Sequence, residues 1–309
     1  MSDPSELELA KDVAAITSVI EGVVNCFDRG DYESLATLYS DHVEMDYSSL
    51  FGGTAHKKTR EQQLMDWAGL LPGFDLVRHS LADFNVRIEE GIAITTCSVV
   101  GQLYLGEKVW EVEGLYQFRL HKRSNHWRIF KQRFVLKTEN GNGDIVETAK
   151  DRAKGHPPPF VKRRKAQAAV VRFLKALENK DMDALADVWS EKAVQDMPYS
   201  PDGFPDVVEG KSNLIKHYSA WPENAGEADF TSNLKFYPMI SPEWVFAEFT
   251  GEVEILTTGR EYNQIYGGLF HVPHGKIQYY REYFNPEPFR FAYDIEEGKE
   301  PDSFPTSEP

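Results

Sequence analysis

Hydrophobic residues in the first half of the chain recur with two different periods. Ile16, Ile20, Val23 and Phe27 return at steps of three or four residues, which predicts an amphipathic helix over residues 6–29. The same spacing predicts two shorter helices, over residues 32–39 and 59–70.

Strict alternation of apolar and polar residues takes over between and after these helices. It predicts a short strand over residues 43–48 and then four long strands, over residues 76–89, 92–105, 109–122 and 127–137. Short turn sequences rich in glycine and polar residues separate the long strands, which indicates an antiparallel meander. Three helices followed by a long, curved sheet predict an α+β fold in which the helices cover the concave face.

A polar connector with glycine and proline follows, and we read residues 141–161 as a linker. The same order of elements then returns: helices over 166–180, 182–189 and 212–220, and strands over 193–197, 229–237, 244–255, 261–271 and 276–285. Adding 150 to a position takes Asp31 to Asp181 and Leu35 to Leu185. The sequence therefore predicts two duplicated domains, over residues 1–140 and 162–290, and an acidic, proline-rich tail over 291–309.

Composition narrows the class of protein. The chain has 309 residues, 41% hydrophobic and 13% aromatic, with a formal net charge of −15. Because nucleic acids and anionic membranes require a basic face, we exclude both as partners. The two cysteines and nine histidines form no metal-ligand motif. Neither a signal peptide nor a membrane-spanning apolar run is found, so we expect a cytoplasmic protein that binds a small molecule.

Two stretches resemble a known family. Residues 46–53 (DYSSLFGG) and 71–75 (LPGFD), with His79 close behind, resemble the SnoaL-like branch of the nuclear transport factor two-like superfamily over residues 8–137. That branch includes scytalone dehydratase, the bile-acid dehydratase and hexachlorocyclohexane dehydrochlorinase. Residues 267–271 and 275–286 are similar to the phenazine-biosynthesis A/B proteins of the same superfamily.

The resemblance implies two helix-closed cones of curved sheet, an apolar pocket in each, and no cofactor or metal. It also implies an internal pseudo-dimer, in a monomer or a homodimer. The family's catalytic dyad falls on Asp28 and His79, and Tyr47 falls near a tyrosine that polarises the substrate carbonyl in the dehydratases. The sequence departs from the dehydratases at Val23 and Val24, where they often carry another tyrosine.

The second half departs further. Adding 150 places Glu178 at the position of Asp28 and Asp229 at that of His79, so the dyad is absent there. It carries Glu282 instead, which matches the catalytic acid of the phenazine proteins, where the first half has Phe134. The two pockets are therefore expected to differ chemically.

A His–Asp pair in an apolar pocket can remove a proton next to a carbonyl and return it to a leaving hydroxyl. This predicts a cofactor-independent dehydratase, isomerase or cyclase acting on a small aromatic, polyketide-like or terpenoid carbonyl compound. Two alternatives stay open: a binding or scaffold protein without chemistry, and a condensation aid that works from Glu282. Further substrate-binding candidates are Asp46, Trp67, Phe74, Gln102 and Glu113. For Gln102 and Glu113, lining the pocket and facing solvent are equal alternatives.

Overall fold

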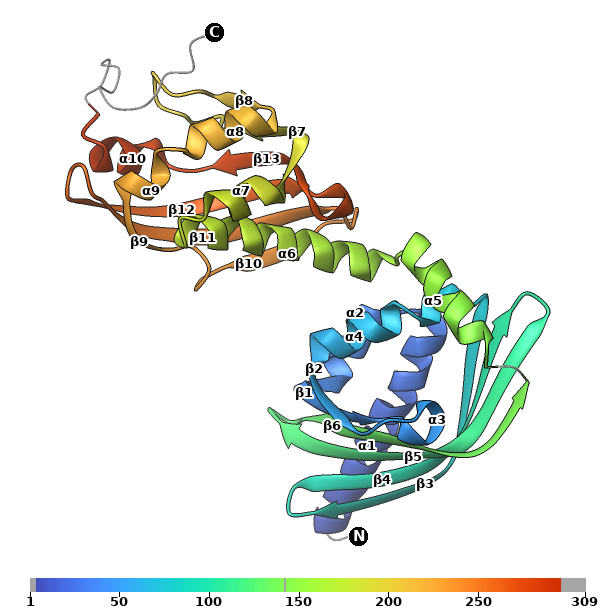
Figure 1. Cartoon of the computed structure of the whole chain (residues 1–309). Helices are drawn as coiled ribbons and strands as arrows, with labels where there is room; N and C mark the ends of the chain where they lie inside the picture. Colours follow the sequence, from blue (N-terminus) through green and yellow to red (C-terminus); the bar gives the residue numbers. More distant parts are fainter. Residues whose placement is uncertain (1–3, 142, 296–309) are drawn as a thin grey trace. The chain divides into compact units, whose positions relative to one another are not determined.

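In the computed structural model, which describes residues 4–141 and 143–295, the chain forms two compact units that divide between Phe160 and Val161. Each unit contains one curved sheet packed with helices (Figure 1). The predicted α+β fold class and the duplication are confirmed. The pseudo-dimer expected for the two units stays a prediction.

The first unit has one six-stranded sheet in the order β2-β1-β6-β5-β4-β3. Its strands are β1 (Tyr39–Asp46), β2 (His56–Thr59), β3 (Leu76–Glu89), β4 (Ile92–Leu105), β5 (Lys108–Arg123) and β6 (His126–Gly141). Its helices are α1 (Pro4–Arg29), α2 (Tyr32–Leu38), α3 (Ser48–Phe51), α4 (Arg60–Ala68) and α5 (Ile145–Gly155), with a 3-10 turn η1 (Leu71–Gly73). The meander predicted for the long strands is confirmed, and β1 joins it by pairing in parallel with β6.

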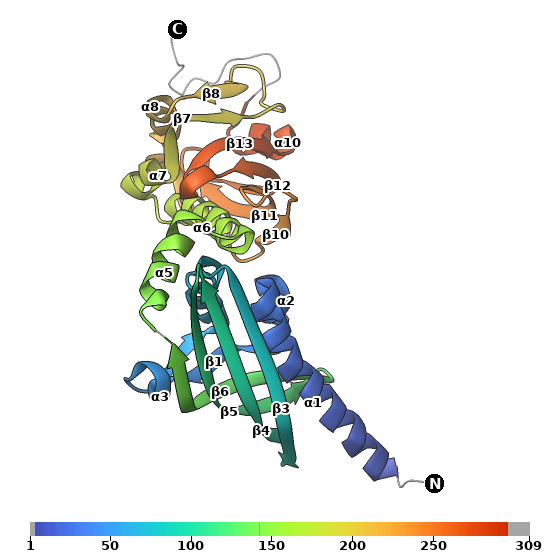
Figure 2. The ribbon, with the colours of Figure 1, turned by 90° about the vertical axis from the view of Figure 1, so that its right-hand side faces the viewer.

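Helix α1 lies across the concave face of this sheet, beside β3 (Figures 1 and 2). Its predicted inner row is confirmed, because Ile16, Ile20, Val23 and Phe27 are all buried. Burying this stripe is what holds the helix on the sheet, since a side chain of this size contributes roughly 1.5–3 kcal/mol when it leaves water. The last turn of α1 therefore lies over the start of β3.

Local side-chain bonds move two element boundaries from where the pattern predicts them. Strand β1 ends at Asp46 and not at Ser48, because the Asp46 carboxylate accepts hydrogen bonds from the Ser48 amide (3.1 Å) and hydroxyl (2.6 Å) and starts α3. Helix α4 begins at Arg60, where Thr59 and Gln62 form a reciprocal capping box.

The segment that we read as a linker contains helix α5, which belongs to the first unit. Ile145, Ala149 and Ala153 of α5 are buried, and the backbone of Ala149 contacts Gly73 in η1. The segment is therefore more ordered and more apolar on one face than its composition indicates.

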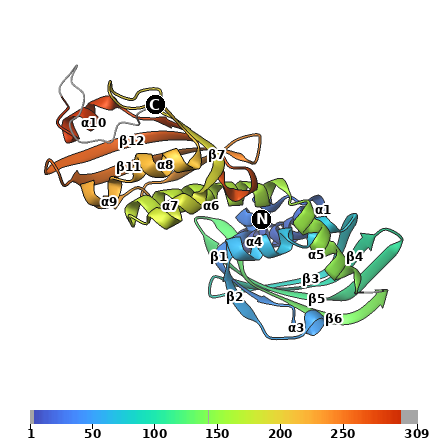
Figure 3. The ribbon, with the colours of Figure 1, turned by 45° about the horizontal axis from the view of Figure 1, so that its top comes forward.

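The second unit has a seven-stranded sheet in the order β10-β11-β12-β13-β7-β8, with β9 paired to β11. Its strands are β7 (Trp189–Asp196), β8 (Val207–Glu209), β9 (Ala225–Asp229), β10 (Lys235–Pro238), β11 (Trp244–Ile255), β12 (Arg260–His271) and β13 (Ile277–Tyr283). Its helices are α6 (Pro159–Glu178), α7 (Met182–Val188), α8 (Lys211–Tyr218), α9 (Trp221–Asn224) and α10 (Pro286–Ala292), with a 3-10 turn η2 (Pro273–Gly275). Helices α6 to α9 lie along one face of this sheet (Figure 3).

The single strand predicted over residues 229–237 is wrong, because the chain forms β9 and β10 with a break between them. At the break, the Asp229 carboxylate accepts hydrogen bonds from the amides of Thr231 (3.1 Å) and Ser232 (3.0 Å). These two amides are therefore not available for hydrogen bonds to a neighbouring strand. In the first unit, β3 stays continuous and absorbs the irregularity as a bulge at Asp83.

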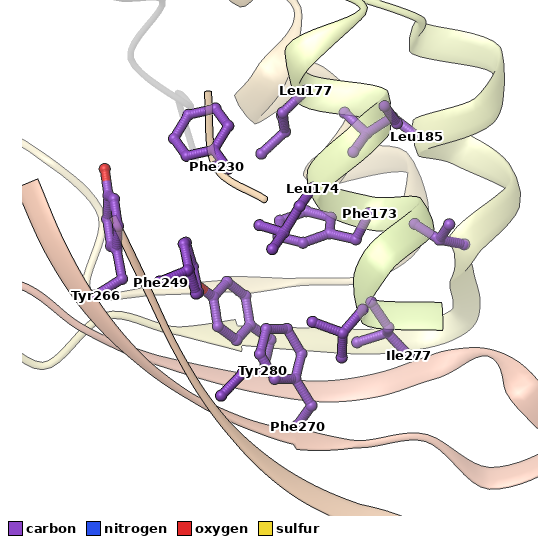
Figure 4. Packing of buried hydrophobic residues seen from close by; sticks show 14 of the residues in the cluster. Phe173, Leu174, Leu177, Leu185, Phe230, Phe249, Tyr266, Phe270, Ile277 and Tyr280 are labelled. Carbon is purple, nitrogen blue, oxygen red and sulfur yellow. The ribbon is translucent and has the colours of Figure 1, made fainter. Parts of the chain in front are cut away.

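Aromatic side chains dominate the core of the second unit. Phe173 of α6 points toward the stacked pair Phe270 and Tyr280, whose ring centroids lie 4.2 Å apart (Figure 4). The predicted anchors Phe289 and Tyr293 pack against this core, whereas Phe291 is exposed. Residues 296–309 of the expected tail lie outside the described residues.

Candidate active site

Asp28 and His79, 51 residues apart along the chain, meet inside the first unit. The Asp28 Oδ1 atom lies 2.7 Å from Nδ1 of His79, and its Oδ2 atom accepts a hydrogen bond of 3.0 Å from the His79 backbone amide. One carboxylate thus holds both the ring and the main chain of the histidine. The His79 side chain is 10% exposed and the Asp28 side chain 25%, so the pair is shielded but reachable.

The turn before β3 sets the position of His79. Gly73 lies against the backbone of α5, and Asp75 accepts a 2.6 Å hydrogen bond from the Gly106 amide and forms an ion pair with Arg152 of α5. Gly101 is paired with His79 on β4, and a side chain there would contact the imidazole ring. The sequence therefore provides both a fixed strand start and room for the ring.

His79 lies in the wall of an aromatic pocket with an empty volume of about 600 Å³, including its mouth. The lining residues are Phe27, Tyr47, Leu50, Phe51, Trp67, Leu70, Leu71, His79, Leu103, Trp110, Val112, Tyr116 and Phe134. Among these lining residues, His79 carries the imidazole, and none is lysine or arginine. Such a pocket suits an uncharged, flat molecule.

Tyr47 and Trp67, two of the predicted site residues, line this pocket with His79. The Tyr47 hydroxyl accepts a 2.7 Å hydrogen bond from Nε2 of Gln132, and its ring stacks on Phe134. Burial raises the pKa of the Tyr47 hydroxyl well above its ordinary value, and the neighbouring Tyr116 and Tyr39 raise it further. The hydroxyl therefore keeps its proton and can donate it in a hydrogen bond.

Four other predicted binding residues are not among those that line the pocket. Their strand neighbours Leu103 and Val112 line it, so Gln102 and Glu113 face the opposite side of the sheet, where they bond Glu111 and Thr138. The pocket-lining alternative for these two residues is therefore wrong. Asp46 forms an ion pair with Arg133, and Phe74 is buried elsewhere in the core.

Tyr116 and Gln132 were missed by the sequence analysis. Tyr116 is buried on the inner face of β5, where Trp110, Val112 and Phe118 precede and follow it at even positions. That alternation was available in the sequence and could have placed Tyr116 in the pocket. Nothing in the pattern marks Gln132, because a buried glutamine resembles a surface residue until its partners are known.

The second unit keeps the carboxylate of the dyad but not the histidine. Glu178, at the end of α6, accepts a 2.8 Å hydrogen bond from the backbone amide of Phe230. This is the bond that Asp28 accepts from the amide of His79. Phe230 and not Asp229 therefore occupies the position of His79, which corrects our alignment by one residue.

Glu282 lies in a second pocket, which has an empty volume of about 970 Å³ including its mouth. Its carboxylate accepts a 2.8 Å hydrogen bond from Nε2 of Gln195, whose Oε1 in turn accepts one of 2.7 Å from the Tyr218 hydroxyl. Burial raises the pKa of Glu282 to about 7, although the bond from Gln195 acts in the opposite direction. A group with this pKa can exchange a proton at neutral pH.

The walls of the second pocket are mostly aromatic, from Phe173, Tyr218, Trp221, Phe230, Phe249, Tyr262, Tyr266, Tyr280, Phe284, Phe289 and Tyr293. His217 also lines it, and burial lowers the pKa of its imidazole to about 4. This histidine therefore stays neutral near pH 7.

Within residues 4–141 and 143–295, two kinds of feature are absent: a cluster of metal ligands and a membrane-spanning helix. In these ranges, no three or more His, Cys, Asp or Glu side chains are grouped so that they could hold a metal ion. Over the same residues, none of the helices is sufficiently long and apolar to cross a membrane.

Comparison with known proteins identifies the family. Two SnoaL-like domain models match the chain, one over residues 8–133 and the other over residues 170–280. The uncharacterised protein YesE of Bacillus subtilis is 31% identical over 129 residues, which are 42% of this chain and 87% of YesE. An uncharacterised PhzA/B-like protein of Pseudomonas aeruginosa is 29% identical over 121 residues, 39% of this chain and 84% of that protein.

Among solved structures, a phenazine biosynthesis-related protein from Pseudomonas aeruginosa is similar to this chain with a TM-score of 0.40 and 22% identity, and it covers 48% of this chain and 91% of its own. The chain belongs to the SnoaL-like family and contains two such domains in tandem.

Proposed function

We propose that the first unit is a cofactor-independent acid–base catalyst, a dehydratase, isomerase or cyclase that acts on a small, uncharged carbonyl compound. The observation that carries this proposal is the 2.7 Å contact between Asp28 and His79 in the wall of an apolar pocket. The aromatic lining favours a flat substrate of the aromatic, polyketide-like or terpenoid kind.

In this proposal, the Asp28 carboxylate accepts the proton on Nδ1 of His79 in a hydrogen bond, which leaves the lone pair on Nε2 free to act as the base. Nε2 takes a proton from the carbon next to the carbonyl, and the electron pair moves onto the carbonyl oxygen as an enolate. Asp28 stabilises the imidazolium that forms. A hydroxyl donor in the pocket, Tyr47 on the basis of the resemblance, stabilises the enolate oxygen.

Two outcomes follow from the same intermediate. In dehydration, the imidazolium returns its proton to a hydroxyl on the β carbon, the carbon–oxygen bond breaks and water leaves. In isomerisation, the proton returns to a different carbon. Neither outcome needs an external electron acceptor. Each requires His79 to transfer one proton.

The test uses proton exchange, which does not require the natural substrate. Wild-type protein is expected to accelerate deuterium uptake at the α carbon of 2-tetralone, 1-indanone or 4-chromanone in D₂O, followed by NMR. Because a positioned base contributes roughly 10²- to 10⁴-fold, His79→Ala should lower the rate by that factor, and Asp28→Asn should lower it as well.

His126→Ala is the matched control, since His126 is exposed at the start of β6. It should exchange at the wild-type rate. A wild-type rate equal to that of buffer for all three ketones, or a His79→Ala protein as fast as wild type, would leave the binding-protein alternative in place.

The second unit supports a second candidate function. Glu282, with its pKa near 7 and its position in an aromatic pocket, could transfer a proton in a condensation or cyclisation. In that case Glu282→Gln should abolish turnover of a substrate that His79→Ala still converts.

A further inference from the structure

The pocket of the second unit surrounds one carboxylate with aromatic rings. Glu282 is the acidic residue among the described residues that line this pocket, and none of those residues is lysine or arginine. Phe230, Phe249 and Tyr266 lie against one another in its wall, with ring centroids between 4.9 and 6.5 Å apart (Figure 4). The charge and the rings therefore belong to the same cavity.

A second group of rings lines the same pocket. Tyr262, Phe289 and Tyr293 have ring centroids between 4.6 and 6.2 Å apart. The face of an aromatic ring carries negative charge density and attracts a cation placed over it. A positive group in this pocket would therefore meet favourable partners in the rings as well as in the carboxylate.

The carboxylate of Glu282 is held in position by a neighbouring amide. The Tyr218 hydroxyl donates to Oε1 of Gln195 (2.7 Å), and Nε2 of Gln195 donates to the carboxylate (2.8 Å). Reversing the amide would turn its oxygen toward the carboxylate and take the acceptor away from Tyr218. Gln195 is buried, whereas Glu282 is only partly buried, so the carboxylate is fixed and still open to a ligand.

Phe230 distinguishes this pocket from the first one. Its amide donates to Glu178 as the amide of His79 donates to Asp28, so the two residues occupy equivalent positions. At this position the first pocket presents an imidazole, which can take a proton. The second presents a phenyl ring, which can only attract charge through its face.

We infer that the second pocket binds an organic cation, whose ammonium group lies between the Glu282 carboxylate and the surrounding aromatic rings. An anion would be repelled by Glu282, and an uncharged ligand would leave the carboxylate without a partner. The net charge of −15 also favours the approach of cations. The inference requires neither the His–Asp pair of the first unit nor proton transfer by Glu282.

Cation binding should depend on the ionisation of Glu282. Burial raises the pKa of Glu282 to about 7 in the empty pocket, so below this pH the cation must displace a proton. His217, with its pKa lowered to about 4 by burial, stays neutral, and Arg281 on the same strand is paired with Asp196. Burial raises the pKa of the tyrosines that line the pocket, which keep their protons: Tyr218, Tyr262, Tyr266, Tyr280 and Tyr293.

The test compares phenyltrimethylammonium with tert-butylbenzene, an uncharged molecule of the same shape, by ligand-observed NMR. At pH 8.5, wild-type protein should bind the cation at least about 10-fold more tightly than tert-butylbenzene. Glu282→Gln should weaken cation binding by about 10- to 100-fold, the range for a charged partner, and leave tert-butylbenzene within a few-fold of wild type. Lowering the pH to 5.5 should weaken cation binding to wild type by about 10- to 30-fold.

Glu252→Gln is the matched control, because Glu252 is exposed on β11. It should bind both molecules like wild type, and so should His79→Ala. Phe230→Leu should weaken the cation several-fold more than tert-butylbenzene. If Phe230→Leu loses both molecules because it does not fold, the Glu282→Gln comparison decides.

The inference is overturned if wild-type protein binds tert-butylbenzene as tightly as the cation at pH 8.5, or if Glu282→Gln binds the cation like wild type. Cation binding that requires Glu282 but does not change with pH would keep the inference and give Glu282 an ordinary pKa. Absence of ketone exchange would remove the proposed function of the first unit and leave this inference standing.

Discussion

The ionisation of Glu282 links a buried carboxyl to the stability of the second unit. Burial raises its pKa from 4.5 to about 7, so the folded chain binds this proton more tightly than the unfolded chain. The stabilising effect is complete below pH 4.5, is lost as the pH rises through 7, and amounts to roughly 1–3 kcal/mol. Urea unfolding should therefore show wild-type stability falling relative to Glu282→Gln between pH 4.5 and 8.

The matched control is Glu252→Gln, because Glu252 is exposed on β11. Its difference from wild type should stay constant across the same pH range. A constant difference for Glu282→Gln as well would mean that Glu282 has an ordinary pKa, and the second candidate function would lose its support.

At the residue scale, the sequence predicts the positions of polar side chains better at the ends of helices and strands than inside strands. Asp28 and His79 could be found because one ends a helix and the other follows a Pro-Gly turn, positions that a family resemblance fixes. Gln102 and Glu113 were ambiguous because their strands are long and bulged, with a register shift at Glu113 itself. Tyr116 required the alternation along β5 to be followed residue by residue.

At the scale of elements, the contact between η1 and α5 supports the strand that carries His79. A Cβ atom on Gly73 would lie 1.8 Å from the backbone oxygen of Ala149, so Gly73→Ala must displace α5 or η1. Overpacking of this kind costs about 1–3 kcal/mol. Thermal unfolding should show that loss, and ketone exchange should slow because Leu70 and Leu71 line the pocket.

Gly155→Ala tests the same helix without the collision, since a Cβ atom there meets nothing within 4 Å. It should be neutral or stabilising by up to about 1 kcal/mol, because alanine favours a helix over glycine. Equal melting temperatures for Gly73→Ala and wild type would show that α5 is not held against η1.

Periodicity predicted most elements but not how they pair or where they break. The spacing of apolar residues gave α1 and the four long strands of the first unit. The parallel pairing of β1 with β6 has no local signal, because it depends on how the chain returns after two helices, a 3-10 turn and four strands. The break between β9 and β10 comes from one carboxylate, that of Asp229, which outweighs an otherwise regular alternation.

At the scale of the whole chain, duplication has kept the frame and changed the chemistry. Each unit has a carboxylate at the end of its long helix that accepts a hydrogen bond from a backbone amide. In the first unit Asp28 accepts from His79, and in the second Glu178 accepts from Phe230. Only the first adds an imidazole to that carboxylate, and the second carries a buried acid, Glu282, in its own aromatic pocket. One scaffold can therefore hold two unrelated sites.

If the units are independent domains, each should fold and keep its own site when separated. We propose that residues 1–160 and 157–309 are sufficient, because the first fragment keeps α5 and the Tyr32–Phe160 ring contact and the second keeps all of α6. Circular dichroism should show a cooperative melt for each. The first fragment should exchange ketone protons at a rate that depends on His79, and the second should keep the pH-dependent stability due to Glu282. Aggregation of either fragment, or loss of exchange in the first, would mean that the two units complete each other and that the duplicated domains no longer function separately.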